Sequence, residues 1–99
     1  MKKALLLHVL AGAALLGGPA WAYYPPEHVD AQYTEQERVA GTLIHGADCA
    51  YYSGAVDYRT SRMVLRNTIR DQGLPVGMAT DVNAENYARA IWRAQGGCR

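Results

Sequence analysis

Three stretches of the chain repeat apolar residues at intervals of three and four, which is the spacing of one face of an α-helix. The first stretch follows Thr34, and Thr34 with Glu37 has the form of a capping box. We therefore expect a helix from Thr34 to about Gly54. Its predicted inner face comprises Val39, Ala40, Leu43, Ile44, Ala47, Ala50 and Tyr51.

Two further helices follow. The second is expected from a cap at Asp57 to Gln72, because Gly73, Leu74 and Pro75 supply a left-handed residue, a hydrophobic follower and a stop. Its predicted inner face is Val64, Leu65, Thr68 and Ile69.

The third helix is capped by Thr80 or Asp81 and ends before Gly96 and Gly97. Its predicted inner face is Ala84, Tyr87, Ala88, Ile91 and Gln95, with Trp92 beside it. Because no alternating strand pattern of useful length occurs, we expect an all-α bundle of about three helices over residues 34–99.

The N-terminal segment has the plan of a signal peptide. Lys2 and Lys3 precede an apolar run over residues 4–16, and a small-x-small site follows at residues 20–22. The run is too short for a spanning helix of about 20 residues. We therefore expect cleavage after residue 22, a periplasmic or secreted protein, and no stable membrane insertion after cleavage.

Residues 23–33 carry two adjacent prolines, Pro25 and Pro26, after two tyrosines. Each proline fixes its own torsion and pushes its predecessor toward extended geometry. An extended, proline-rich arm is therefore expected between the signal peptide and the helical domain.

The composition of the chain after cleavage limits the classes of function that we expect. Residues 23–99 hold eight arginines, no lysine and nine acidic residues, a formal charge of −1. A nucleic-acid binder needs an excess of cations, so nucleic acid is not an expected partner. Large aliphatic residues are scarce, and a core alone gives a domain below about 80 residues only a few kcal/mol.

The two cysteines, Cys49 and Cys98, are expected to supply the missing stability. An even number of cysteines in an exported chain indicates a disulfide. In the chain-entropy model, closing a loop of about 50 residues stabilises the fold by roughly 4 kcal/mol.

The most distinctive predicted surface is a row of arginines on the second helix. Their spacing of i, i+3, i+7 and i+11 places all of them within an arc of roughly 80°. Like charges four residues apart repel, so the row requires acidic partners. The four are Arg59, Arg62, Arg66 and Arg70.

Two interpretations of this row remain open. Acids of the neighbouring segment (Glu35, Glu37 or Asp30) neutralise it, or water solvates it. Alternatively, the row binds an acidic patch on another protein, with tyrosines as amphipathic contacts, and charge reversal at Arg62 and Arg66 should then abolish partner capture. The tyrosines are Tyr51, Tyr52 and Tyr58.

Catalysis and cofactor binding are not expected. After cleavage only His28 and His45 remain, and no serine has a histidine and a carboxylate at a recognisable spacing. His45 with Asp48 or Cys49 offers too few ligands for a metal, and the chain lacks the Cys-x-x-Cys-His motif of haem attachment. Glu85 and Arg89 are expected to form an ordinary exposed pair without a functional role.

Residues 49–54 (Cys-Ala-Tyr-Tyr-Ser-Gly) on one helix, and an alanine-rich helix ending in Gly96-Gly97-Cys98, resemble the small periplasmic immunity proteins of type VI secretion. Those proteins are helical, are pinned by disulfides, and block a toxin that attacks the cell wall. The resemblance implies an inhibitor of such a toxin, although it transfers no functional residue. In size and two-cysteine plan, the chain is also similar to the acid-stress chaperones of the enterobacterial periplasm.

Three functional hypotheses follow. The leading one is an exported protein that binds another protein through the arginine row and the neighbouring tyrosines. The second is a periplasmic chaperone that exposes its thin core when acid protonates its carboxylates. The third is an accessory subunit of an envelope assembly.

Overall fold

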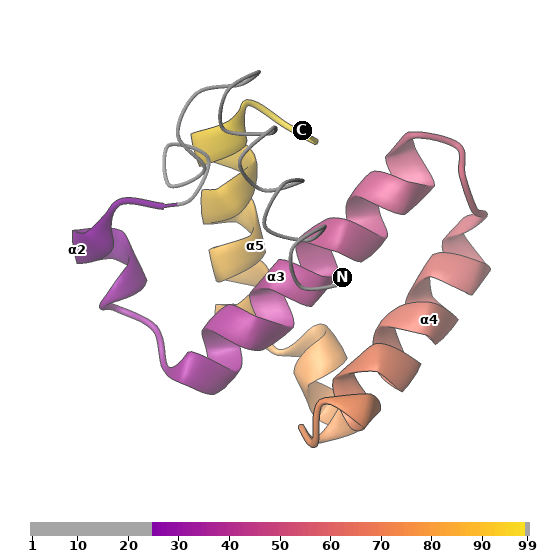
Figure 1. Ribbon diagram of the computed structural model, residues 1–99, viewed down its shortest axis with the longest axis horizontal. Helices are drawn as coiled ribbons and strands as arrows, with labels where there is room; N and C mark the ends of the chain where they lie inside the picture. The colour runs from indigo at the N-terminus through magenta and orange to yellow at the C-terminus, as the bar shows by residue number, and fades with distance from the viewer. Residues whose placement is uncertain (1–24, 99) are drawn as a thin grey trace, which may run out of the picture.

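The computed structural model describes residues 25–98, and these residues form four α-helices and one 3₁₀ segment (Figure 1). The expected signal peptide at residues 1–22 lies outside the described residues. The elements are α2 (Glu27–Asp30), α3 (Glu35–Tyr52), α4 (Tyr58–Asp71), η2 (Val76–Thr80) and α5 (Val82–Gln95). The all-α prediction is confirmed for this part of the chain, and α3, α4 and α5 are the three expected helices.

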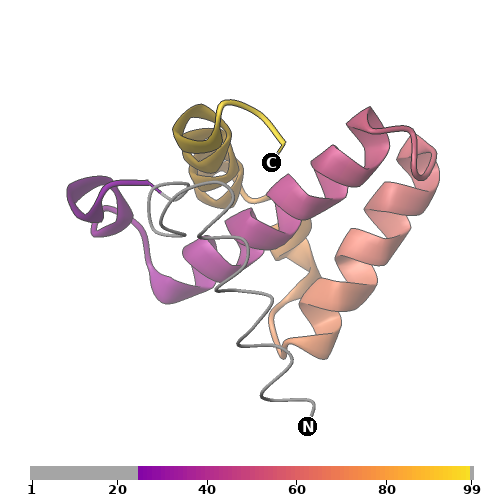
Figure 2. The ribbon, with the colours of Figure 1, turned by 45° about the horizontal axis from the view of Figure 1, so that its top comes forward.

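Helix α3 is the central element of the fold. Helices α4 and α5 both pack on it, and η2 lies against α4, α3 and α5 (Figures 1 and 2). Helix α4 runs back along α3 after a short turn, whereas α5 crosses α3 on another side. No helix within residues 25–98 is long and apolar enough to cross a lipid bilayer.

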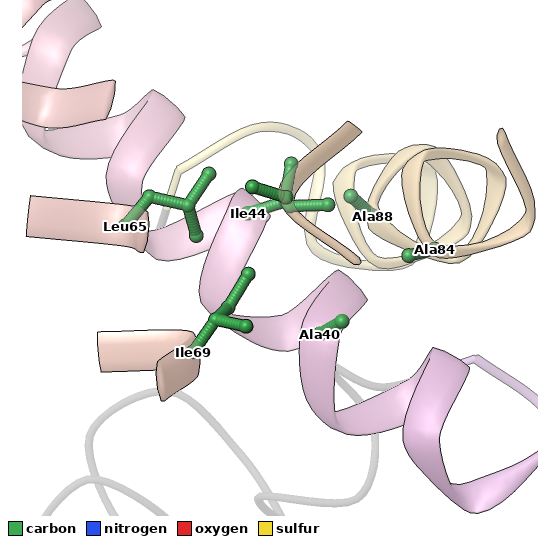
Figure 3. Packing of buried hydrophobic residues seen from close by; sticks show 7 residues of the cluster. Ala40, Ile44, Leu65, Ile69, Ala84 and Ala88 are labelled. Atoms are coloured by element: carbon green, nitrogen blue, oxygen red, sulfur yellow. The ribbon is translucent and has the colours of Figure 1, made fainter. Parts of the chain in front are cut away.

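The core is small and rich in alanine. Ile44 of α3 points into the space between Leu65 of α4 and Ala88 of α5 (Figure 3). Alanines allow α5 to approach α3 closely, but each contributes little buried apolar area. The buried cluster is Ala40, Ile44, Leu65, Ile69, Ala79, Ala84 and Ala88.

The expected helix ends are confirmed. Thr34 and Glu37 form the complete capping box of α3, and Asp57 Oδ1 accepts from the backbone N–H of Thr60 at 2.7 Å. Gly73 adopts a left-handed φ of 77°, as the stop signal required. Asp81, rather than Thr80, caps α5.

Two of the expected inner faces are partly wrong. On α3, the buried face includes Gly41 and His45, while Tyr51 is exposed. On α4, Val64 is exposed and Ser61 is buried instead. The single-stripe prediction failed on α3 because this helix is covered on two sides, so its buried arc extends from the α4 side round to α5.

The extended arm expected over residues 23–33 is wrong for Glu27–Asp30, which form one helical turn, α2. Pro26 precedes the turn, and its carbonyl accepts from the N–H groups of Val29 and Asp30. Proline has no backbone N–H, and at the N-cap of a helix this costs no intrahelical hydrogen bond.

Hydrogen bonds, an ion pair and a ring contact between side chains hold α2 against the bundle. Arg38 lies 3.6 Å from the Asp30 carboxylate and donates to the Tyr33 carbonyl at 2.5 Å. Tyr87 of α5 donates its hydroxyl proton to Asp30, and its ring packs edge-on against Tyr33. The segment before α3 is therefore bound to α5 rather than free.

The predicted disulfide between Cys49 and Cys98 is confirmed, with the two Cα atoms 5.4 Å apart and 49 positions separating them in the sequence. His45 reinforces this connection, because its Nε2 lies 3.1 Å from the Gly97 carbonyl oxygen. The C-terminal end of α5 is thus attached to the second half of α3 by a covalent bond and a buried polar contact.

Gly41 marks the closest approach of α3 to α5. A Cβ atom at this position would lie 2.6 Å from the carbonyl oxygen of Ala84 and 2.9 Å from the Tyr87 Cβ. A backbone carbonyl cannot move aside, so Gly41→Ala should lower the free energy of unfolding by about 1–3 kcal/mol.

Gly46 on the same helix provides the matched control, because a Cβ atom there meets nothing within 4 Å. Gly46→Ala should raise the free energy of unfolding by up to about 1 kcal/mol. Urea unfolding of both variants measures the contrast, and equal effects of the two substitutions would contradict the close crossing.

Two capping carboxylates make the fold sensitive to acid. The backbone N–H of Thr34, with help from the Asn83 amide, lowers the pKa of Glu37 below 4.5, and the backbone N–H of Thr60 lowers the pKa of Asp57 below 3.8. A carboxylate whose pKa is lowered by folding stabilises the fold above its unfolded pKa, and that contribution disappears as the pH falls through the lowered value.

We therefore expect the difference in unfolding free energy between the wild type and Glu37→Gln to shrink between about pH 6 and about pH 3. Urea unfolding followed by circular dichroism at several pH values measures this difference. A pH-independent difference would show that the charge of Glu37 is irrelevant to the cap.

Candidate functional site

Four exposed aromatic side chains form a continuous row across one end of the molecule. Ring centroids lie 5.3 Å apart for Tyr58 and Tyr51, 5.2 Å for Tyr51 and Tyr52, and 5.7 Å for Tyr52 and Trp92. We call these four residues the aromatic row. Tyr52 and Tyr58 keep 69 % and 58 % of their surface exposed, so the row offers a large apolar area to a partner.

The aromatic row joins three helices. Tyr51 and Tyr52 are the last two residues of α3, and neighbouring helical residues point about 100° apart. Tyr51 therefore reaches the start of α4, where Tyr58 lies, while Tyr52 reaches Trp92 of α5. The nearby Cys49–Cys98 disulfide holds the end of α5 at this position.

Arg62 is fixed beside this row. Its Nη2 donates to Asp48 Oδ1 at 2.5 Å, and its guanidinium carbon lies 5.2 Å from the centre of the Tyr58 ring. Its Nε also faces the Ser61 hydroxyl at 3.4 Å. The acid that pairs with the arginine row is therefore Asp48, which is not among the acids that the sequence predicts as its partners.

None of the three acids proposed from the sequence as partners of the row pairs with it, and two of them are engaged elsewhere. Glu37 accepts from Thr34 and Asn83, while Asp30 contacts Arg38 and Tyr87. Glu35 forms no ion pair with an arginine in the described chain. The prediction that these acids neutralise the row is thus wrong.

The remaining arginines of the row differ from Arg62. Arg59 and Arg66 are exposed, and neither forms an ion pair within residues 25–98. Arg70 is also exposed, and its Nη1 lies 3.4 Å from Asn67 Oδ1. The structure thus brings Tyr51, Tyr52 and Tyr58 together with Arg62, whereas Arg70 lies two helical turns further along α4.

A groove of about 610 Å³ adjoins the aromatic row. Its floor is formed by Ile44, His45 and Asp48 of α3, and Tyr52 lies at the end of α3. Arg62 of α4 forms one wall. Glu85, Ala88, Arg89 and Trp92 of α5 form the other.

The structure gives Glu85 and Arg89 a different place from the one expected. Both line the groove, and no ion pair joins them in the described chain. Trp92, which the helical periodicity places only beside the inner face of α5, also lines the groove. Its position could have been anticipated, since it is the only tryptophan outside the expected signal peptide and lies six residues before a disulfide-bonded cysteine.

His45, Cys49 and Cys98 are the residues in the described chain that bring three potential metal-binding atoms within 4.8 Å of one another. Their sulfur atoms are bonded to each other, and a disulfide sulfur has no thiolate charge to offer a metal. This cluster therefore attaches the C-terminus and does not form a metal site.

Comparison with known proteins gave no match among family models, curated protein sequences or solved structures.

Arg62 is paired with Asp48, whereas Arg59 has no ion-pair partner in the described chain. The same charge reversal should therefore affect the stability of the fold differently at these two arginines. Arg62→Glu would place two carboxylates together, and we expect it to lower the free energy of unfolding by about 1–3 kcal/mol. Arg59→Glu should change that free energy by no more than about 0.5 kcal/mol, because Arg59 is exposed in the first turn of α4, where acidic residues are favourable.

Urea unfolding of the two variants checks this difference. The double variant Asp48→Arg with Arg62→Glu restores opposite charges and should recover part of the loss. An Arg62→Glu variant as stable as the wild type would show that the ion pair contributes nothing to the fold.

Proposed function

We propose that this chain is an exported protein that binds another protein through the aromatic row and the arginines beside it. The observation that carries the proposal is the uninterrupted contact from Tyr58 through Tyr51 and Tyr52 to Trp92, on a molecule with few large apolar side chains in its core. Tyrosine, tryptophan and arginine are the residue types that most often dominate binding energy at protein interfaces.

The geometry supports such a role because the row is preorganised. Each ring contacts the next, and Arg62 is held between Asp48 and Tyr58. Side chains that are already ordered lose less conformational entropy when a partner binds. Two further exposed arginines of α4, Arg59 and Arg66, would accelerate encounter with an acidic surface.

The positive charge of the exposed arginines indicates which class of partner would bind. The exposed guanidinium groups favour an acidic patch, to which they can bond through two N–H groups each. A disulfide is compatible with a periplasmic or extracellular location. Inhibition of a toxin, as the resemblance to immunity proteins implies, is the specific form of this function that we propose.

Site-specific photocrosslinking in living cells tests the proposal. A photoreactive amino acid in place of Tyr52 or Tyr58 should crosslink to one dominant protein. The same amino acid in place of Gln36, an exposed residue in the first turn of α3, should not. Arg59→Glu combined with Arg66→Glu should reduce the crosslink from position 52 by at least about tenfold.

The double charge reversal is chosen to leave the fold intact, because neither arginine has an ion-pair partner in the described chain. Reversal of Arg62 is avoided, since it would disturb the contact with Asp48. Equal crosslinking from positions 36, 52 and 58 would refute the proposal. Mass spectrometry of the captured protein separates a toxin from a subunit of an envelope assembly.

A further inference from the structure

The groove beside the aromatic row has an uneven charge distribution. Arg62 on the α4 wall and Asp48 on the floor neutralise each other, with their charged atoms 2.5 Å apart. On the α5 wall, Arg89 is exposed without an ion-pair partner in the described chain, and Glu85 is half-buried. Arg66 lies one helical turn beyond Arg62 on the same side of α4 and does not itself line the groove. One available guanidinium group is therefore on the α5 wall, and a second is just beyond the α4 wall.

The groove also has an apolar centre. Ile44 and Ala88 line it, and they are 3 % and 6 % exposed. Tyr52 and Trp92, whose ring centroids are 5.7 Å apart, lie at its aromatic end. An apolar side chain placed here would cover the floor and contact both rings.

These features together favour one type of occupant. A chain segment with a central apolar side chain and carboxylates on both sides would satisfy the apolar floor and the guanidinium groups at once. A basic segment would face Arg66 and Arg89, which no ion pair in the described chain neutralises, and like charges brought together at an interface are costly. The volume of about 610 Å³ is enough for a few residues of such a segment.

Building on the proposed protein-binding function, we infer that the groove receives a short acidic segment of the partner protein. An apolar side chain of that segment lies over Ile44 and Ala88, and its carboxylates reach Arg89 on one wall and Arg66 just beyond the other. The aromatic row then forms the outer contact, and the groove determines which acidic proteins are accepted.

Two substitutions on the same wall should act in opposite directions. Arg89→Glu should weaken the binding of a short synthetic peptide with glutamates on both sides of a central leucine by at least about tenfold. Glu85→Gln removes the acid from the groove and should strengthen binding several-fold. The control is Gln36→Glu with Gln72→Glu, which changes the net charge as much as Arg89→Glu does, at exposed positions that do not line the groove.

Binding is measured on the full exported protein through the indole N–H resonance of Trp92, assigned by comparison with Trp92→Phe. The matched peptide with lysines in place of the glutamates should not shift this resonance, and neither should free glutamate. Circular dichroism confirms that each variant is folded.

The outcomes separate this inference from the proposed function. If positions 52 and 58 crosslink to a partner but the acidic peptide leaves the Trp92 resonance unchanged, the partner uses only the aromatic row and the groove inference is overturned. If the acidic peptide binds equally well to wild type, Arg89→Glu and Glu85→Gln, or if free glutamate binds as well as the peptide, the inference is overturned too. Absence of crosslinks from positions 52 and 58 instead refutes the protein-binding function itself.

Discussion

The covalent link between Cys49 and Cys98 is the constraint on which the rest of this structure depends. The buried cluster consists largely of alanines and three larger aliphatic side chains, so burial alone stabilises it weakly. Closing a loop of 49 positions removes roughly 4 kcal/mol of chain entropy from the unfolded state in the usual model. That contribution is comparable to the whole stability of many domains of this size.

The link also determines where the candidate site forms. It joins the last turns of α3 to the end of α5, and the Nε2 contact from His45 to the Gly97 carbonyl adds a second attachment. At the other end of α5, Asn83 donates to Glu37 at 2.7 Å and Tyr87 donates to Asp30. Helix α5 is thus held at both ends, which keeps Trp92 beside Tyr52 and fixes one wall of the groove.

Local signals in the sequence were sufficient to predict α3, α4 and α5, although they missed the single turn of α2. The capping residues Thr34 and Asp57, the stop at Gly73 and the disulfide each depend on neighbours in the chain or on a simple count of cysteines. Periodicity failed where a helix has two neighbours, because one apolar stripe cannot describe a face shared by α4 and α5. It therefore missed the burial of His45, and no local rule could pair Arg62 with Asp48 fourteen positions away.

The partnership of Asp48 and Arg62 has a consequence for how this surface can diversify. Arg59, Arg66 and Tyr52 are exposed, so substitutions there would change the proposed binding surface and leave the fold intact. Arg62 belongs to that proposed surface and also to the fold through its ion pair, so a reversal of its charge would require a compensating change at position 48. Correlated substitutions at these two sites would then be the signature of an evolutionary switch from acidic to basic ligands.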